Sequence, residues 1–146
     1  MRKKNLIVIM IVLAVIAAVA VAALLIPANT PAPPADTELT AAGYVYITAG
    51  QEGRWFELPE EESSITIRRT MEDGTERTNV IQFTPDSVCM HSSTCDNQDC
   101  VEQGIVSLAN KGERVLQNLI VCLPNEVSIE LFSQAEMAQM LESSAE

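Results

Sequence analysis

The sequence is poor in the side chains that catalysis most often uses. Its 146 residues contain one histidine, His91, so any mechanism that needs an imidazole depends on that residue alone. The chain also lacks a Gly-x-Ser-x-Gly elbow, a phosphate-binding glycine loop and a Cys-x-x-Cys pair, which mark common nucleophilic, phosphate and dithiol sites. We therefore predict that the protein is not an enzyme and needs no cofactor.

Polar residues are absent between Leu6 and Ile26. At about 1.5 Å per residue, a helix over this run is roughly 30 Å long, which matches the hydrocarbon core of a bilayer. A cleavable signal peptide is the alternative, and its apolar region usually has about 7–15 residues. The small residues after Ile26 leave a cleavage site open as well. The sequence predicts one transmembrane helix over 6–26, behind a basic N-terminus at 1–5.

Basic residues are absent between Lys4 and Arg54. Since basic residues that flank a transmembrane helix stay in the cytoplasm, we expect the N-terminus there and everything after Ile26 outside it. All 20 acidic residues lie beyond Ile26, against six of the nine basic ones, which gives this part a formal charge of about −14. Such a surface repels phosphate groups. We expect contact with the membrane through the helix and with an envelope or membrane protein, but not with nucleic acid.

Large aromatic residues are absent from 27–42, and this stretch is rich in proline, as is typical of an extended linker. The segments that follow, such as "YVYITAG" and "SITIRRTMEDGTERTNVIQF", are rich in β-branched residues and are separated by turns. Among the turns, Asp73-Gly74 is a dipeptide that tight hairpins favour. The pattern predicts an all-β domain over 43–132, with a small β-sandwich or barrel-like fold.

The C-terminal segment, 133–146, has a different pattern. Ser133 and Glu136, three residues later, match the capping box that begins many helices. Met137 and Met140 then recur at helical spacing. The segment is therefore predicted to form a short C-terminal helix.

Two stretches carry a resemblance to a known family. They are "STCDNQDCVEQG" (93–104) and "LIVCLPNEVSIEL" (119–131), with "NVIQFTPDSV" (79–88) before them. The arrangement resembles the NusG domain II family over roughly 43–131. The residues that match the family pattern are Cys95, Cys100, Val101, Gly104, Cys122, Leu123, Pro124 and Asn125.

The resemblance implies a compact all-β domain in a small, membrane-anchored, extracytoplasmic bacterial protein. It implies no particular activity, and the family name, taken from an insert in a bacterial transcription factor, does not imply a role in transcription. The chain has no room for the other domains of that factor, and its acidic part is unsuited to nucleic acid. The sequence departs from the family pattern at Asp96, where a proline is common, and at Cys89, which is an additional cysteine.

The segment from Cys89 to Cys100 contains three of the four cysteines and the histidine, and the fourth cysteine is Cys122. Thiols outside the cytoplasm can form disulfides, and four cysteines permit three full pairings. We predict at least one disulfide, with Cys122 bonded to Cys95 or Cys100. Cys89 then takes the remaining partner or stays free. A bond from Cys122 would stabilise the domain by about 3 kcal/mol.

Two other uses of the cysteines stay open. A metal site would use Cys95 and Cys100 as one pair, since their spacing suits a zinc knuckle, although the sequence has no second knuckle. Its other ligands would come from Cys122, Cys89 and His91. Thiol–disulfide exchange is disfavoured because nearby carboxylates raise the pKa values of thiols. The carboxylates in question belong to Asp96, Asp99 and Glu102.

The sequence therefore predicts an extracytoplasmic, membrane-anchored, non-catalytic interaction or accessory module that is stapled by its cysteines. The alternative is a thiol redox or metal-binding module associated with membrane electron transfer.

Overall fold

The computed structural model describes residues 31, 33–34 and 38–144. The predicted N-terminus at 1–5 and the predicted transmembrane helix at 6–26 lie outside the described residues, as does part of the predicted linker. No helix among the residues described has the length and apolar character that a membrane crossing needs. All the strands and helices that the structure describes belong to one compact unit, Ala32–Glu146.

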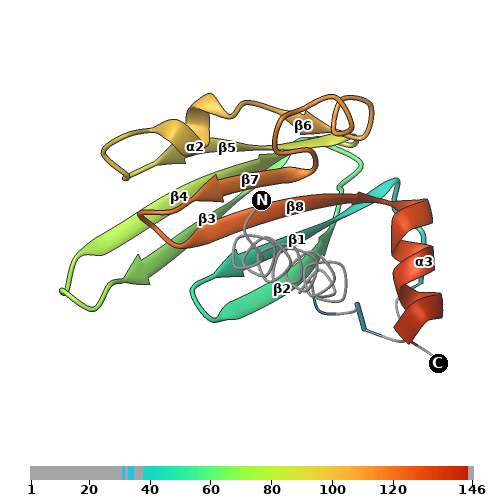
Figure 1. Ribbon diagram of the computed structural model, residues 1–146, viewed down its shortest axis with the longest axis horizontal. Helices are drawn as coiled ribbons and strands as arrows, with labels where there is room; N and C mark the ends of the chain where they lie inside the picture. The colour runs from blue at the N-terminus through green and yellow to red at the C-terminus, as the bar shows by residue number, and fades with distance from the viewer. Residues whose placement is uncertain (1–30, 32, 35–37, 145–146) are drawn as a thin grey trace, which may run out of the picture. The chain divides into compact units, whose positions relative to one another are not determined.

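The domain consists of two four-stranded antiparallel sheets (Figure 1). The first has the strand order β2-β1-β8-β7 and contains β1 (Gly43–Ala49), β2 (Glu52–Glu57), β7 (Leu119–Cys122) and β8 (Val127–Ser133). The second has the order β3-β4-β5-β6 and contains β3 (Ser63–Thr70), β4 (Glu76–Phe83), β5 (Ser87–Ser93) and β6 (Val106–Ser107). The all-β prediction is confirmed.

One hydrophobic core joins the two sheets. In β4, the buried side chains of Ile81 and Phe83 alternate with the half-buried Gln82, as expected for a strand with one face on a core. Val45 of β1 and Leu131 of β8, which pair across the first sheet, belong to the same core. The two sheets are therefore held together by the apolar side chains that each removes from water.

The predicted hairpin turn lies between β3 and β4. Gly74 has a φ of +82°, a left-handed conformation that glycine adopts without strain. Its N–H donates a hydrogen bond to the Met71 carbonyl over 2.9 Å. The glycine therefore sets the geometry of this turn.

The predicted C-terminal helix is α3 (Gln134–Ser144). Its capping box is present, since the Ser133 N–H donates to Glu136 Oε2 over 2.7 Å and the Glu136 N–H donates to Ser133 Oγ over 3.3 Å. Lys111 adds an ion pair to Glu136. Met137 is fully buried and the helix packs on β1 and β8, so it docks on its own domain.

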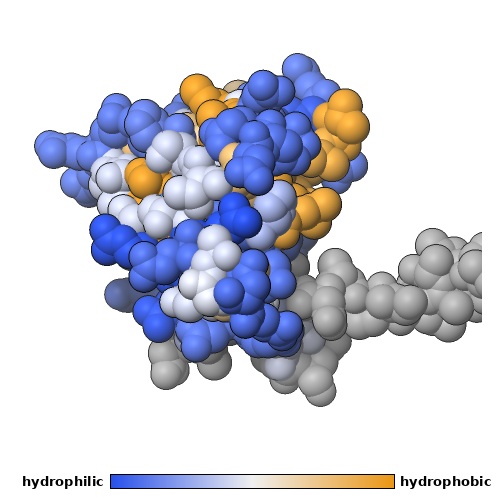
Figure 2. Space-filling view, turned by 90° about the vertical axis from the view of Figure 1, so that its left-hand side faces the viewer, coloured by the Kyte–Doolittle hydropathy of each residue, from blue (hydrophilic) through white to orange (hydrophobic). Residues whose placement is uncertain are grey.

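The surface of the domain is mostly polar. Figure 2 looks onto the left-hand side of Figure 1, where the β3–β4 turn lies, and most of that face is hydrophilic. In the described part of the chain, the large apolar side chains that are mostly exposed all lie in connecting segments, at Ile105, Val115, Leu116 and Leu123.

Candidate cysteine site

Three cysteines from separate elements meet inside the domain. Cys95 lies in the loop after β5, Cys100 lies in the one-turn helix α2 (Asp99–Glu102), and Cys122 ends β7. Their sulfur atoms all lie within 4.8 Å of one another, and Cys95 Sγ is 3.4 Å from Cys100 Sγ. Each side chain is only 1–2% exposed, so the three cysteines belong to the core.

The short helix α2 brings Cys100 inward, and the sequence pattern does not predict this helix. Gln98, which precedes it, has a φ of +54°. The Gln98 side-chain amide donates to the Ser93 carbonyl over 3.0 Å and also to the Cys95 carbonyl. These hydrogen bonds fold the loop back on itself, so that Cys100 faces Cys95.

The other two candidate residues lie elsewhere. Cys89 stands on β5 between Val88 and Met90, which are buried, so its side chain points to the outer face of the sheet. Cys89 Sγ lies 3.8 Å from Gln82 Oε1. His91 is exposed and does not belong to the cysteine group. No disulfide joins the four cysteines, all of which lie in the described part of the chain.

A buried polar network borders the cysteines. Ser93 Oγ lies 3.6 Å from Cys122 Sγ. The same oxygen accepts hydrogen bonds from the side-chain amides of Asn79 and Asn125, each over 3.1 Å, and from the Cys95 N–H over 3.2 Å. Because these three groups donate to the Ser93 oxygen, the Ser93 hydroxyl can donate its proton to Cys122 Sγ.

This network gives the neighbouring thiols different pKa values. Burial raises the pKa of the Cys100 thiol. Burial also acts to raise the pKa of Cys122, but hydrogen bonds from Ser93, Asn79 and Cys100 outweigh it, and the pKa of Cys122 is lowered. The sequence-based expectation that carboxylates raise the thiol pKa values is therefore wrong for Cys122, because hydrogen-bond donors surround its sulfur.

Chemically, the arrangement allows two outcomes. Three thiols at this spacing can form one disulfide and leave one thiol, or they can supply three sulfur ligands to a single metal ion. Two disulfides within the site are not possible, because Cys89 lies on the outer face of β5.

Comparison with known families confirms the resemblance seen in the sequence. A family model described as NusG domain II matches residues 6–135. The chain belongs to the NusG domain II family. A search of curated proteins found no match.

Solved structures to which this NusG domain II protein is similar include three bacterial proteins. The Lin0431 protein from Listeria innocua is 18% identical, with 62% of this chain and 95% of that chain covered and a TM-score of 0.47. A DUF1312 family protein from Enterococcus faecalis is 18% identical, with 62% and 97% covered and a TM-score of 0.46. A DUF1312 family protein from Ruminococcus gnavus is 23% identical, with 62% and 99% covered and a TM-score of 0.44.

The remaining residues of the NusG domain II pattern shape the surroundings of the cysteines. Gly104 follows α2 with a φ of +72°, so a side chain there would be strained. Val101 packs on the core. Leu123 and Pro124 form the turn after Cys122 and line a small cavity beside it. Asn125 is fully buried and bonds to the polar network described above.

Sequence reasoning did not single out Asn79, Ser93 or Gln98. Asn79 had a detectable signal, because it lies two residues before Ile81 in β4 and so shares the core face with it. A polar residue in such a position usually has a buried hydrogen-bond partner. Ser93 and Gln98 carry no comparable signal, since their roles depend on how the loop folds.

Proposed function

We propose that this NusG domain II protein is a single-pass protein of the bacterial cell membrane, with its N-terminus in the cytoplasm and its β domain outside. Its role is to bind another envelope or membrane protein as a non-catalytic accessory domain. The support is the apolar run at 6–26, the basic residues before it and the linker at 27–42. The family match over 6–135 includes the apolar run.

The burial of the three cysteines is the main support for a non-catalytic role. Reactive thiols stand in partly exposed positions where a thiolate can meet its substrate, whereas Cys95, Cys100 and Cys122 are 1–2% exposed. We therefore assign these cysteines to stability. Two of the thiols are oxidised to one disulfide while the chain folds, before they are buried. An external disulfide takes up their two electrons and two protons and leaves as two thiols, and the new bond cross-links the segment after β5.

A thiol redox or metal-binding module, associated with membrane electron transfer, is the second candidate. It is favoured by the three sulfur atoms within 4.8 Å of one another and by the lowered pKa of Cys122. Thiolate sulfur suits soft ions such as Zn²⁺ and Cu⁺. These residues fit three of the four ligands of a zinc site, and a fourth would have to come from water or another molecule.

The membrane topology is tested with the full-length chain in bacterial cells. Protease added to intact cells should digest the β domain and leave an N-terminal tag protected. A β domain that resists protease until the cells are lysed would overturn the proposed location.

The role of the cysteines is tested by intact mass and elemental analysis of the full-length protein, purified without reductant and alkylated after unfolding. One disulfide predicts that only two of the four cysteines react and that no metal is present. A stoichiometric metal, or a disulfide that opens under mild reductant, would favour the second candidate instead. Four reactive thiols without metal would contradict both assignments.

A further inference from the structure

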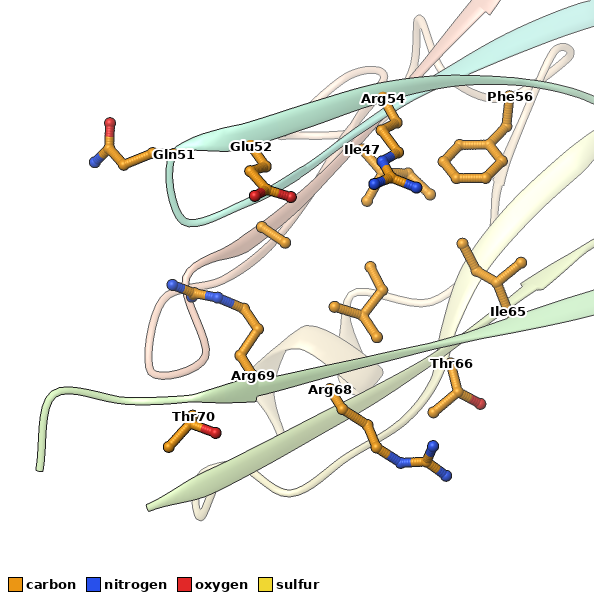
Figure 3. Close-up of a pocket in the computed structure, with 12 residues that line it drawn as sticks. Ile47, Gln51, Glu52, Arg54, Phe56, Ile65, Thr66, Arg68, Arg69 and Thr70 are labelled. Carbon is orange, nitrogen blue, oxygen red and sulfur yellow. The ribbon is translucent and has the colours of Figure 1, made fainter. Parts of the chain in front are cut away.

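A groove of about 610 Å³ lies where β2 of one sheet faces β3 of the other. Figure 3 shows Arg54 and Phe56 of β2 pointing towards β3, and Ile65 of β3 pointing back towards β2. Ala49, Phe56, Ile65 and Ile67 are partly buried and pack on the core. The floor of the groove is therefore apolar.

Both walls of the groove are edge strands. β2 ends the first sheet and β3 ends the second, so in the described part of the chain each has one side without a neighbouring strand. Every residue from Ile65 to Thr70 lines the groove. A free edge of this kind can pair with an extended peptide, and alternate side chains of such a peptide then point into the groove.

The groove is basic although the domain is acidic. Three of the six basic residues that follow the apolar run line it, Arg54, Arg68 and Arg69, against one carboxylate, that of Glu52. Arg69 forms a 2.9 Å ion pair with Glu126. Arg54 and Arg68 are exposed and have no partner among the residues described. Figure 3 shows that Arg54 points into the groove, whereas Arg68 points away from it, to the opposite face of β3.

We propose that the free edge of β3 binds an extended segment of a partner protein in which apolar and acidic side chains alternate. This rests on the proposed accessory function and locates its binding surface. A segment added beside β3 places alternate side chains on the two faces of the sheet, so its apolar side chains contact Phe56, Ile65 and Ile67. Its carboxylates, on the opposite face, meet Arg68. A second copy of the chain fits poorly, because pairing β3 with β3 brings like-charged arginines together.

The test uses the full-length chain in detergent and a fluorescent eight-residue peptide that alternates valine and glutamate. A peptide that alternates valine and lysine is the charge-reversed probe. We expect the acidic peptide to bind at least about ten times more tightly than the basic one, because the basic peptide meets like charges. Binding should also slow hydrogen exchange of the β3 amides, as strand addition requires.

Two variants with the same change in charge make the test specific. Arg68→Gln should weaken binding of the acidic peptide by up to about fivefold, the size of one exposed ion pair. Val115→Asp is the control, because Val115 is 99% exposed and does not line the groove. Its binding should match that of the unchanged protein.

Equal binding of the two peptides, no binding, or equal effects of the two variants would overturn the docking site. Displacement of the bound peptide by the soluble anionic lipid dihexanoylphosphatidylglycerol would show that the surface binds a lipid. Dimerisation that depends on Arg68 would show that it binds a second copy of the chain. None of these results bears on membrane topology. A domain that lies outside the cytoplasm but binds no peptide would therefore leave the accessory function in place and remove only this site.

Discussion

The side-chain amide of Asn125 donates a hydrogen bond to the side-chain carbonyl of Asn79 over 2.8 Å, across 46 residues of sequence. Asn125 lies in the turn between β7 and β8 of the first sheet, and Asn79 lies in β4 of the second. Both are buried, and both donate to Ser93 Oγ. This small network fixes how the two sheets meet beside the cysteines.

Removal of the Asn125 side chain should destabilise the domain. Asn125→Ala leaves the Asn79 carbonyl without its donor in a buried site, which should lower the free energy of unfolding by about 1–3 kcal/mol. Urea denaturation measures the change. In a double-mutant cycle, Asn79→Ala should cost much less in the Asn125→Ala background than alone. Fully additive effects would show that the two amides are not coupled.

The buried and the outer cysteine should differ in their effect on stability. Cys122→Ala removes a fully buried sulfur and the partner of the Ser93 hydroxyl, so it should lower the free energy of unfolding by about 1–3 kcal/mol. Cys89→Ala is the matched control on the outer face of β5 and should cost less than about 1 kcal/mol. Thermal unfolding of both variants, with and without reductant, measures this. Equal losses would argue against a special role for the buried cluster.

The capping box should make α3 sensitive to acid. Burial acts to raise the pKa of Glu136, but hydrogen bonds from Lys111 and Ser133 outweigh it and lower the pKa below its ordinary value of 4.5. A lowered folded-state pKa means that the stabilisation is present above the unfolded pKa and is lost as the pH falls through the folded one. Glu136→Gln should therefore cost about 1 kcal/mol near neutral pH and little in strong acid.

Thermal unfolding of the Glu136→Gln variant across pH checks this prediction. Glu142→Gln is the control, because Glu142 is an exposed residue of the same helix. A loss that is the same at every pH would contradict the assigned cause.

The β3–β4 turn should require glycine because of the positive φ at Gly74, and not because a larger side chain would clash with its neighbours. Gly74 has a φ of +82°, and a Cβ added to it would meet no atom within 4 Å, so Gly74→Ala adds only backbone strain. The cost should be about 1 kcal/mol in urea denaturation. Gly112 also has open space around it but lacks the positive φ. Gly112→Ala should therefore leave stability unchanged or slightly raised.

Local features were predictable from the sequence. Alternation revealed β3 and β4, Asp73-Gly74 revealed the turn between them, and Ser133 with Glu136 revealed the start of α3. Each of these signals lies within a few residues of the structure it specifies. The outward position of Cys89 was also within reach, because Val88 and Met90 on either side of it are apolar.

Long-range features were not predictable in the same way. The grouping of Cys95, Cys100 and Cys122 depends on α2, whose single turn is too short to show a helical period. The groove between β2 and β3 depends on which strands lie at the edges of the two sheets. The alternation of apolar and polar residues within one strand does not specify the order of the strands.

The pairing of β1 with β8 has a consequence for the order in which the domain folds. The hydroxyl groups of Thr48 and Ser128 lie 2.6 Å apart although 80 residues separate them in the chain. During synthesis, one edge of β1 therefore has no partner strand until β8 has been made. Sheets closed by such distant segments fold on the scale of milliseconds to seconds. A chain that stops before Val127 lacks β8, so the edge of β1 that would pair with β8 stays unpaired. A long unpaired edge of this kind promotes aggregation.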